Sequence, residues 1–484
     1  MKNVLNAQGV RDAESELING GLDVMLLRFN AALAVADGIY ARASAVGAKT
    51  AVFCGPGGNG YDGILAACRL KRLGCDVRLY LVGKREAFDA SSLKYAENCG
   101  LEPFACGEYG GGANVIIDAI FGIGLNREIT GETKSLIERL NSEQAFRLAV
   151  DIPSGLNADT GMAMGVAFRA DVTVTFSCYK IGQLFDGAEY CGKIIVEDVG
   201  IPTRSSVKVC EDADFKPIRR KKTAHKGTSG RIFVIGGSGN MIGAPIMAGA
   251  AAHAATLSGA GTVTVCLPSV HRAAATSRVT MAMLKFLPDT TDGFIRFDKK
   301  SLDEIMEKAS AIVIGMGMGA APELNKIVKY VCENYDGALV IDADAINALK
   351  HDYAFIKNGK ARVALTPHVG EFRRLTGKEA TVENAAALAR ELGAIVALKS
   401  STTIITDGNE VRLNITGTPA MAKGGMGDVL GGCIAALSCS FSLFDAACVA
   451  CYRNGLGAEN AVKSYSELML TARDVLNFAG YDEI

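Results

Sequence analysis

Residues 51–70 read AVFCGPGGNGYDGILAACRL, and this stretch decides the class of fold. A short apolar run leads into a glycine-rich loop, and the loop opens a segment of helical periodicity over 64–73. The loop amides and the helix N-terminus would then converge above a sheet edge, where an anion is the natural ligand. A tight turn without a ligand explains the same glycines, so the loop by itself leaves both interpretations open.

Three glycines of this loop, Gly55, Gly57 and Gly60, also satisfy the GxGxxG pattern of dinucleotide-binding folds. In those folds a carboxylate after the next strand holds a ribose hydroxyl. Here the next strand ends in Val-Gly-Lys-Arg at 82–85, which could tolerate a 2′-phosphate but supplies no carboxylate. The sequence therefore does not support a dehydrogenase of that type.

The strand–helix pattern continues along the chain in two series, which predicts two α/β domains with mostly parallel sheets and helices on both faces. The first series has apolar runs at 51–54, 77–82, 114–118, 148–151, 172–176 and 194–196. The second has them at 232–235, 263–267, 312–314, 339–341, 363–365, 395–398 and 403–405. The pattern lapses over 202–226, where a basic run at 219–222 is interpreted as a solvated linker. We predict domains at 1–215 and 216–484.

The composition restricts the partners and the compartment. Lys and Arg number 51 against 52 Asp and Glu, so no positive field would hold nucleic acid. The N-terminus lacks a signal sequence, and the uncharged stretches 243–265 and 429–444 are interpreted as buried helices rather than membrane spans. The 14 cysteines form neither the two CxxC pairs nor the CxxC…HxxxH spacing of a zinc site, which favours a reducing compartment. We expect a cytoplasmic protein that binds neither nucleic acid nor membranes.

Polar residues follow the predicted strands of the first half. Asp118 closes the third strand and Asp151 the fourth, while Asn59 and Ser154 lie in the loops that follow two of the strands. Ligands of open α/β sheets bind at these strand ends, so the side chains are expected to converge. Their oxygens suit an alkali or alkaline-earth ion, although capping and turn formation are the alternative roles.

Three motifs of this half resemble those of the NAD(P)H-hydrate epimerase domain: GPGGNGYDG (55–63), DAIFGIGLNREITG (118–131) and VDIPSGLNADTG (150–161). The resemblance covers most of 1–215 and implies a Rossmann-like, three-layer domain with a parallel sheet. It implies that Asn59, Asp118 and Ser154 hold K⁺, and that Asp151 and Lys180 exchange protons with the hydrated ring. The implied substrate-binding residues are Gly58, Asn59, Gly60, Tyr61, Asp62, Gly122, Ile123, Gly124, Leu125, Asn126, Arg127, Glu128 and Asp151.

This half departs from the family pattern at a few positions. Gly58 and Tyr61 stand where Asn and Gly are usual, and Arg28-Phe29 replaces an acidic motif. The changes at Gly58 and Tyr61 are the best support for an alternative hypothesis, in which the first half binds a nucleotide without catalysing a reaction.

The second half carries TGTPAMAKGGMGD at 416–428, directly before an apolar helical segment. The backbone amides of Gly424, Gly425, Met426 and Gly427 would form an anion hole at the helix N-terminus. Asp428, in the first turn, could accept a proton from a substrate hydroxyl as a phosphate arrives. A capped helix without chemistry is the alternative. No GxxxxGK[ST] motif occurs, so phosphate chemistry of the P-loop type is excluded.

Further motifs accompany this segment at predicted strand ends: HKG (225–227), VIGGS (234–238), GMGMG (315–319), DADAIN (342–347), TPHVGE (366–371) and KSSTT (399–403). Together they resemble the NAD(P)H-hydrate dehydratase branch of the ribokinase-like fold, over about 223–484. The resemblance implies a substrate site of Ala244, Gly317, His368 and Asp428, with Asp428 as the base. The implied nucleotide-binding residues are Lys399, Ser400, Ser401, Thr402, Thr403 and Gly427.

The leading hypothesis is a two-domain repair enzyme for hydrated NADH and NADPH. The first half would equilibrate the R and S hydrates, and the second would dehydrate the S form. The implied cofactors are K⁺ for the first half, Mg²⁺, and ADP or ATP as cosubstrate, with ADP favoured. Its partners would be these small molecules, and we expect a homo-oligomer. The alternative is a nucleotide-binding module fused to a ribokinase-like vitamin or sugar kinase.

Overall fold

The computed structural model describes residues 1–40, 47–215, 229–254, 260–279, 282–350, 352–464 and 466–481. It divides into two compact units, Lys2–Ser205 and Ser206–Ile484, with Met1 assigned to the second. The division lies earlier than the predicted boundary at 215/216, because β10 (Val207–Val209) pairs with β19 (Val411–Asn414) of the second unit. The basic run at 219–222 and the motif at 225–227 lie outside the described residues.

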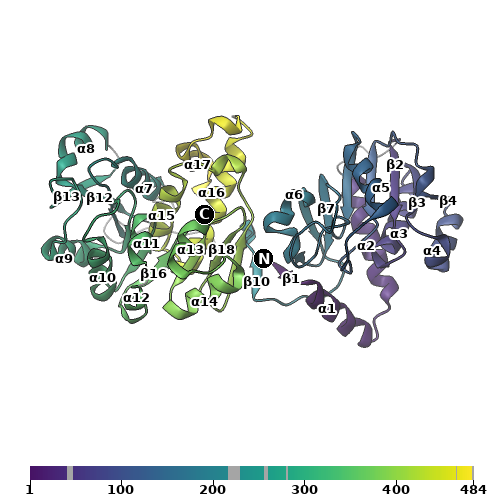
Figure 1. Ribbon diagram of the computed structural model, residues 1–484, viewed down its shortest axis with the longest axis horizontal. Coiled ribbons are helices and arrows are strands. Elements are labelled where there is room, and N and C mark those ends of the chain that lie inside the picture. Colours follow the sequence, from purple (N-terminus) through teal and green to yellow (C-terminus); the bar gives the residue numbers. More distant parts are fainter. Residues whose placement is uncertain are drawn as a thin grey trace. The chain divides into compact units, whose positions relative to one another are not determined.

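The first unit is built on a sheet in the order β4-β3-β2-β5-β6-β7-β9, in which each neighbouring pair of strands is parallel. Figure 1 labels the elements. The strands are β2 (Lys49–Cys54), β3 (Asp76–Leu81), β4 (Pro103–Ala105), β5 (Val115–Ala119), β6 (Phe146–Val150), β7 (Val172–Phe176) and β9 (Lys193–Glu197). The helices are α1 (Ala7–Asn19), α2 (Val24–Tyr40), α3 (Gly58–Arg72), α4 (Ala90–Asn98), α5 (Gly131–Ser142) and α6 (Ala188–Cys191). A separate parallel pair joins β1 (Lys2–Leu5) to β8 (Tyr179–Lys180).

Both faces of this sheet are covered, because successive strand residues point to opposite sides. Val52 lies in one buried cluster with Val35 of α2 and Ile64 of α3. Phe53, the next residue along β2, lies in another cluster with Ile137 of α5. The three-layer parallel arrangement predicted for the first half is thus confirmed.

The second unit contains a longer sheet in the order β13-β12-β11-β14-β15-β16-β17-β18-β19-β10. The strands from β13 to β17 are parallel, and β18 is antiparallel to both of its neighbours. Its other strands are β11 (Arg231–Ile235), β12 (Thr262–Pro268), β13 (Met283–Leu287), β14 (Ala311–Ile314), β15 (Ala338–Ile341), β16 (Arg362–Leu365), β17 (Ile395–Leu398) and β18 (Thr403–Thr406). The mostly parallel α/β class is confirmed, while β13, β19 and β10 are strands that the sequence did not predict.

The longer helices of this unit flank that sheet: α7 (Gly243–Ala254), α9 (Lys299–Lys308), α10 (Leu324–Asn334), α13 (Val369–Thr376), α14 (Val382–Leu392), α15 (Met426–Leu437) and α16 (Leu443–Ala461). The shorter ones are α8 (Arg272–Arg278), α11 (Asp344–Leu349), α12 (Ala354–Asn358) and α17 (Ala472–Phe478). Helix α15 packs closely on α7, and a Cβ at Gly432 would lie only 2.1 Å from the carbonyl oxygen of Ala248. This contact fixes the helix whose N-terminus carries the predicted anion hole.

Two predicted helices are shorter than expected. The helix predicted over 429–444 ends with α15 at Leu437, and a new helix, α16, begins where Ser442 caps the backbone amide of Asp445. The stretch 243–265 forms α7 and then the start of β12, where β-branched residues favour a strand. Among the described residues, no helix has both the length and the apolar character needed to cross a membrane.

Candidate functional sites

A cavity of about 500 Å³ lies at the carboxyl ends of the strands of the first unit. The loops after β2, β5 and β6 supply its walls, as expected for a ligand site in an open parallel sheet. Many of the predicted residues line it: Gly58, Asn59, Asp62, Gly122, Ile123, Gly124, Leu125, Asn126, Arg127, Asp151 and Lys180. The structure therefore brings most of the predicted epimerase residues together.

Three predicted residues, Gly60, Tyr61 and Glu128, are not among those that line this cavity. Gly60 lies beneath the loop, where a Cβ would approach the carbonyl oxygen of Gly55 to 1.7 Å. Tyr61 is buried in the core on the other side of the loop, and the guanidinium of Arg28 lies 4.0 Å from its ring centroid. The two departures at Arg28 and Tyr61 thus pack against each other rather than line the cavity.

Asp151 and Lys180 form a buried ion pair at the floor of the cavity. The Lys180 ammonium also donates to Thr175 Oγ1 at 2.9 Å and to the Phe176 carbonyl at 3.2 Å. Asp151 has a positive φ of 63°, a costly conformation for a non-glycine residue. Gln183 holds it there by donating to its carbonyl at 2.7 Å. Such strain at a polar residue is typical of functional sites.

Two further acids face the same cavity, Glu14 from α1 and Asp62 from α3. Among the residues that the structure describes, Oδ1 of Asp62 is buried without a hydrogen-bond partner, and burial raises the pKa of this carboxyl well above its usual range. Burial also raises the pKa of Glu14, helped by the nearby charge of Asp151. The sequence analysis did not identify Glu14, because α1 precedes the strand–helix alternation and carries no motif.

Asn59, Asp118 and Ser154 meet around the backbone of Phe121. Asn59 donates to the Phe121 carbonyl at 3.1 Å, and the Phe121 amide donates to Ser154 Oγ at 2.8 Å. Ser154 Oγ in turn donates to Asp118 Oδ1 at 2.6 Å. Asp118 is fully buried, and burial raises its pKa to about 6 in spite of these hydrogen bonds. No cationic side chain of the described residues contributes to that shift, so the cluster presents oxygen ligands and an acid whose charge no neighbouring cation balances.

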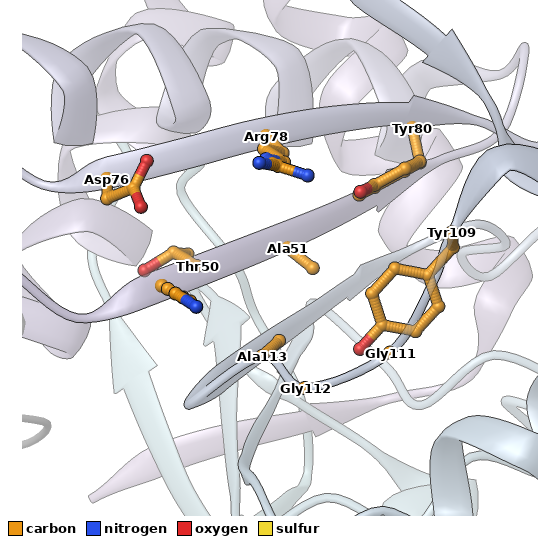
Figure 2. Close-up of a pocket in the computed structure, with 10 residues that line it drawn as sticks. Thr50, Ala51, Asp76, Arg78, Tyr80, Tyr109, Gly111, Gly112 and Ala113 are labelled. Carbon is orange, nitrogen blue, oxygen red and sulfur yellow. The ribbon is translucent and has the colours of Figure 1, made fainter.

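A second, smaller cavity of about 90 Å³ lies at the opposite end of the same sheet. Figure 2 shows Thr50 on β2, Arg78 and Tyr80 on β3, and Tyr109 from the loop before β5. Tyr80 stacks on Phe53 with the ring centroids 5.1 Å apart, and Tyr109 meets Tyr80 edge-on at 5.2 Å. Because ligands of such sheets bind at the carboxyl ends of strands, the larger cavity is the candidate site.

The second unit places Asp428 in the first turn of α15, directly after the glycine loop. Gly425 has φ = 93°, a conformation that glycine adopts readily, and it lets the chain turn into the helix. Burial raises the pKa of Asp428 to about 6, and the charges of Asp342 and Asp344 add to the effect. The amides of the loop and this carboxyl therefore share one helix N-terminus.

Lys399 faces the same loop. Its ammonium donates to Asp342 Oδ1 at 2.8 Å, and Thr366 Oγ1 donates to the same oxygen at 2.7 Å. A Cβ at Gly427 would lie 3.2 Å from Lys399 Nζ and 3.5 Å from Asp342 Oδ2. The side chain of Lys399 thus lies beside the anion hole. Asp342 was not assigned to the site from sequence, although its position at the end of a strand was the available signal.

The other residues of the predicted nucleotide site form the connection from β17 to β18. Ser400 Oγ donates to the carbonyl of Thr402 at 2.5 Å, and Thr403 Oγ1 to that of Ser400 at 3.4 Å. Ser400 and Ser401 are exposed, whereas Thr402 is buried. Only part of this predicted set is therefore open to a ligand.

The predicted substrate residues of this unit take different positions. His368 caps α13, and its Nδ1 accepts from the amides of Gly370 and Glu371 at 3.0 and 3.3 Å. The imidazole is nevertheless 53% exposed, and its other nitrogen, Nε2, lies 3.5 Å from Oε1 of Glu371. Gly317 and Ala244 are neighbours, since a Cβ at Gly317 would lie 3.4 Å from that of Ala244.

The fold and the two sites define a two-domain α/β protein, with a cavity lined by an aspartate–lysine ion pair in one unit and a glycine loop at a helix N-terminus in the other. Residues 232–477 match the family model described as NAD(P)H-hydrate dehydratase, and residues 25–182 match that of the YjeF-related protein N-terminus. The bifunctional NAD(P)H-hydrate repair enzyme Nnr of Hyperthermus butylicus is 34% identical, over 96% of this chain and 89% of that protein. The Nnr of Moorella thermoacetica is 32% identical, over 94% and 92%. The chain belongs to the family of bifunctional NAD(P)H-hydrate repair enzymes.

One solved structure is also similar, the ADP/ATP-dependent NAD(P)H-hydrate dehydratase from Bacillus subtilis co-crystallized with ATP/Mg²⁺. It is 30% identical with a TM-score of 0.47, covering 54% of this chain and 91% of that one.

Proposed function

We propose that the two units carry out two consecutive steps in the repair of hydrated NADH and NADPH. The first unit interconverts the R and S hydrates. The second unit removes water from the S hydrate and consumes ADP or ATP. The nearly full-length similarity to bifunctional repair enzymes supports this assignment. The observation that carries it is Asp428 at the amide-lined N-terminus of α15, beside the ammonium of Lys399.

In the second unit, Asp428 would accept the proton of the substrate hydroxyl as its oxygen attacks the terminal phosphorus of the nucleotide. The amides of 424–427 and the Lys399 ammonium would stabilise the negative charge on the transferred group. The lone pair of the ring nitrogen then expels phosphate, and loss of a proton from the neighbouring carbon restores the double bond. The products are the reduced dinucleotide, phosphate and the nucleotide shortened by one phosphate.

Mg²⁺ would neutralise the phosphates of the nucleotide. It is usually bound by those phosphates and one or two carboxylates. Asp342 would hold it through Oδ2, the oxygen that faces Gly427. Asp342 also positions Lys399, so one buried carboxylate would orient both positive charges.

In the first unit, Asp151 and Lys180 would serve as the proton acceptor and donor at the hydrated ring. Their contact, and the three acceptors of the Lys180 ammonium, fix both groups before substrate binds. Burial raises the pKa of Asp62 well above its usual range, which favours the neutral carboxyl that could donate a hydrogen bond to a substrate oxygen.

K⁺ would be held by Asn59, Asp118 and Ser154. The fit is supported by the buried Asp118, which has no cationic partner within the described part of the chain, and by the oxygens gathered around Phe121. Bound there, the ion would supply positive charge next to the loop 122–127, which lines the substrate cavity.

The test is incubation with a mixture of both hydrate epimers, with ADP or ATP, while the absorbance of the reduced nicotinamide is followed. Complete conversion of the mixture is expected. Conversion of only one epimer would leave the first unit without its proposed activity. Phosphorus NMR gives a second readout, because a persistent phosphate ester in place of free phosphate would indicate a kinase.

A further inference from the structure

Two cavities lie side by side along α11, next to the proposed dehydratase site. One of about 860 Å³ is lined by Gly319, Asp344, Asn347 and Lys350, among others. The other, of about 500 Å³, is lined by Asn347, Lys350, Glu371 and Arg374, with two apolar residues. The two cavities adjoin at Asn347 and Lys350, which line both, and we call them together the α11 groove.

The groove begins at residues that belong to the proposed reaction. Asp344 lines its first part and lies close enough to Asp428 for its charge to act on that carboxyl. In the second part, a Cβ at Gly370 would lie 2.9 Å from His368 Cε1 and 3.4 Å from Arg374 Nη1. The guanidinium of Arg374 is therefore next to the imidazole of His368. A substrate whose ring lies at Asp428 and His368 would extend its other end along the groove.

The far part of the groove carries two basic side chains, Arg374 and Lys350, and one acid, Glu371. Arg374 donates from Nε at 3.2 Å and from Nη2 at 3.0 Å to Oδ1 of Asn347, a neutral acceptor. Within the part of the chain that the structure describes, neither Arg374 nor Lys350 has an ion pair. The one acid of this cavity, Glu371, is 5% exposed and accepts from the amide of His368.

Asn347 also sets the orientation of the guanidinium. By accepting from Nε and one Nη2 hydrogen, it leaves the Nη1–Nη2 edge free for a second ligand. That edge presents two parallel donors, the geometry that matches phosphate oxygens in bidentate pairs. The hydrated dinucleotide is rich in such groups, with a diphosphate bridge and, in the NADPH form, a 2′-phosphate.

We infer that Arg374, oriented by Asn347 and assisted by Lys350, binds a phosphate group of the hydrated dinucleotide in the dehydratase unit. The inference rests on the proposed function, and it adds a substrate-specificity residue to that site. Arg374 acts on binding alone, because it lies along the groove rather than at the reacting atoms.

The experiment compares Arg374→Ala with Arg373→Ala. Both arginines are exposed on α13, but Arg373 is paired with Glu379 and does not line the groove. Steady-state kinetics are measured with the hydrates of NADH and of NADPH at saturating ADP or ATP. We expect Arg374→Ala to raise the KM of the hydrate about tenfold to a hundredfold, the loss typical of a charge-assisted pair. The kcat, the KM of the nucleotide and all constants of Arg373→Ala should stay near wild type.

The two substrates identify the phosphate. An equal rise for both hydrates assigns Arg374 to the diphosphate, and a rise for the NADPH hydrate alone assigns it to the 2′-phosphate; either supports the inference. Any other pattern, including an unchanged KM or a loss confined to kcat or to the nucleotide, overturns it. If Arg374→Ala is unstable on heating, Arg374→Lys keeps the charge, and its KM should lie between those of wild type and Arg374→Ala. A wild-type enzyme that yields no reduced dinucleotide would instead refute the proposed function.

Discussion

Each of the two sites contains a lysine paired with an aspartate, but the pairs face their substrates differently. In the first unit the acid of the pair, Asp151, itself lines the cavity with Lys180. In the second, Asp342 is buried beneath Lys399, and a separate acid, Asp428, is left beside the pair. The first arrangement suits proton exchange between two groups in contact. The second separates the proton acceptor from the positive charge that meets a phosphate.

The difference has a chemical basis. An epimerisation converts the substrate into its own epimer with no net gain or loss of protons. One group that removes a proton and a second that returns one are therefore sufficient. Dehydration through a phosphate ester needs a base that stays free of ion pairing, together with a fixed positive charge at the transferred group. The Asp151–Lys180 pair would therefore exchange protons with the substrate, whereas Asp342 would position Lys399 for the transferred phosphate.

The sharpest test of this comparison is Asp428→Asn. We expect dehydration to fall by about 10⁴-fold, the upper range for loss of a general base, because Asp342 is already paired and cannot replace it. Nucleotide-dependent recovery of absorbance measures the loss, and epimer exchange should stay at the wild-type rate. Asp445→Asn is the matched control, since Asp445 also lies in the first turn of a buried helix but is exposed. Near-normal turnover of Asp428→Asn would eliminate it as the base.

The converse variant is Asp151→Asn, which should slow epimer exchange by about 10²–10³-fold and leave dehydration of the S hydrate unchanged. Asparagine is chosen because it tolerates the positive φ of this position better than alanine does. NMR of the two hydrates measures the exchange rate. A matched control is Asp159→Asn, since Asp159 follows the same strand but does not line the cavity. Unchanged exchange in Asp151→Asn would show that the Asp151–Lys180 pair is structural.

Much of the fold could be predicted, because hydrophobic periodicity and strand-end glycines are local signals. The strands that were missed show the limit. β10 and β13 are short and partly exposed, so their apolar pattern is weak, and pairing with β19 and with β12 stabilises them as strands. The division at 205/206 differs from the predicted boundary at 215/216 for the same reason, since β10 pairs with β19 of the second unit.

The site residues show the same difference between local sequence signals and tertiary structure. Residues in contiguous motifs, such as Asn59 and Asp62, were identified and do line the cavity. Glu14 reaches it from a helix outside those motifs, and only tertiary structure brings it there. Tyr61 shows the opposite error, because a motif gives the position of a residue but not the direction of its side chain along α3.

The pH dependence of dehydration is a further test of the second site, and its expected effect is smaller than those of the two variants above. Burial and the charge of Asp342 raise the pKa of Asp428 to about 6, while Lys399 opposes the shift. Only the ionised form accepts a proton, so dehydration should be independent of pH above 6 and should fall about tenfold per pH unit below it. The variant Lys399→Met removes the opposing charge, so the inflection in kcat/KM should move to higher pH. An inflection at the same pH in both enzymes would show that another group titrates.

The smallest effect concerns the loops that form the two sites. A Cβ at Gly60 would lie 1.7 Å from the carbonyl oxygen of Gly55, whereas one at Gly58 meets nothing within 4 Å. Gly60→Ala must therefore displace backbone, and we expect a loss of about 1–3 kcal/mol in the free energy of unfolding of the first unit, with impaired epimer exchange. Gly58→Ala is the matched control and should cost nothing measurable. In the second unit Gly424 is as open as Gly58, so Gly424→Ala should also leave stability unchanged. If Gly60→Ala and Gly58→Ala were equally stable, the backbone around Gly60 would accommodate a Cβ without cost. Gly60 would then not be required for close packing.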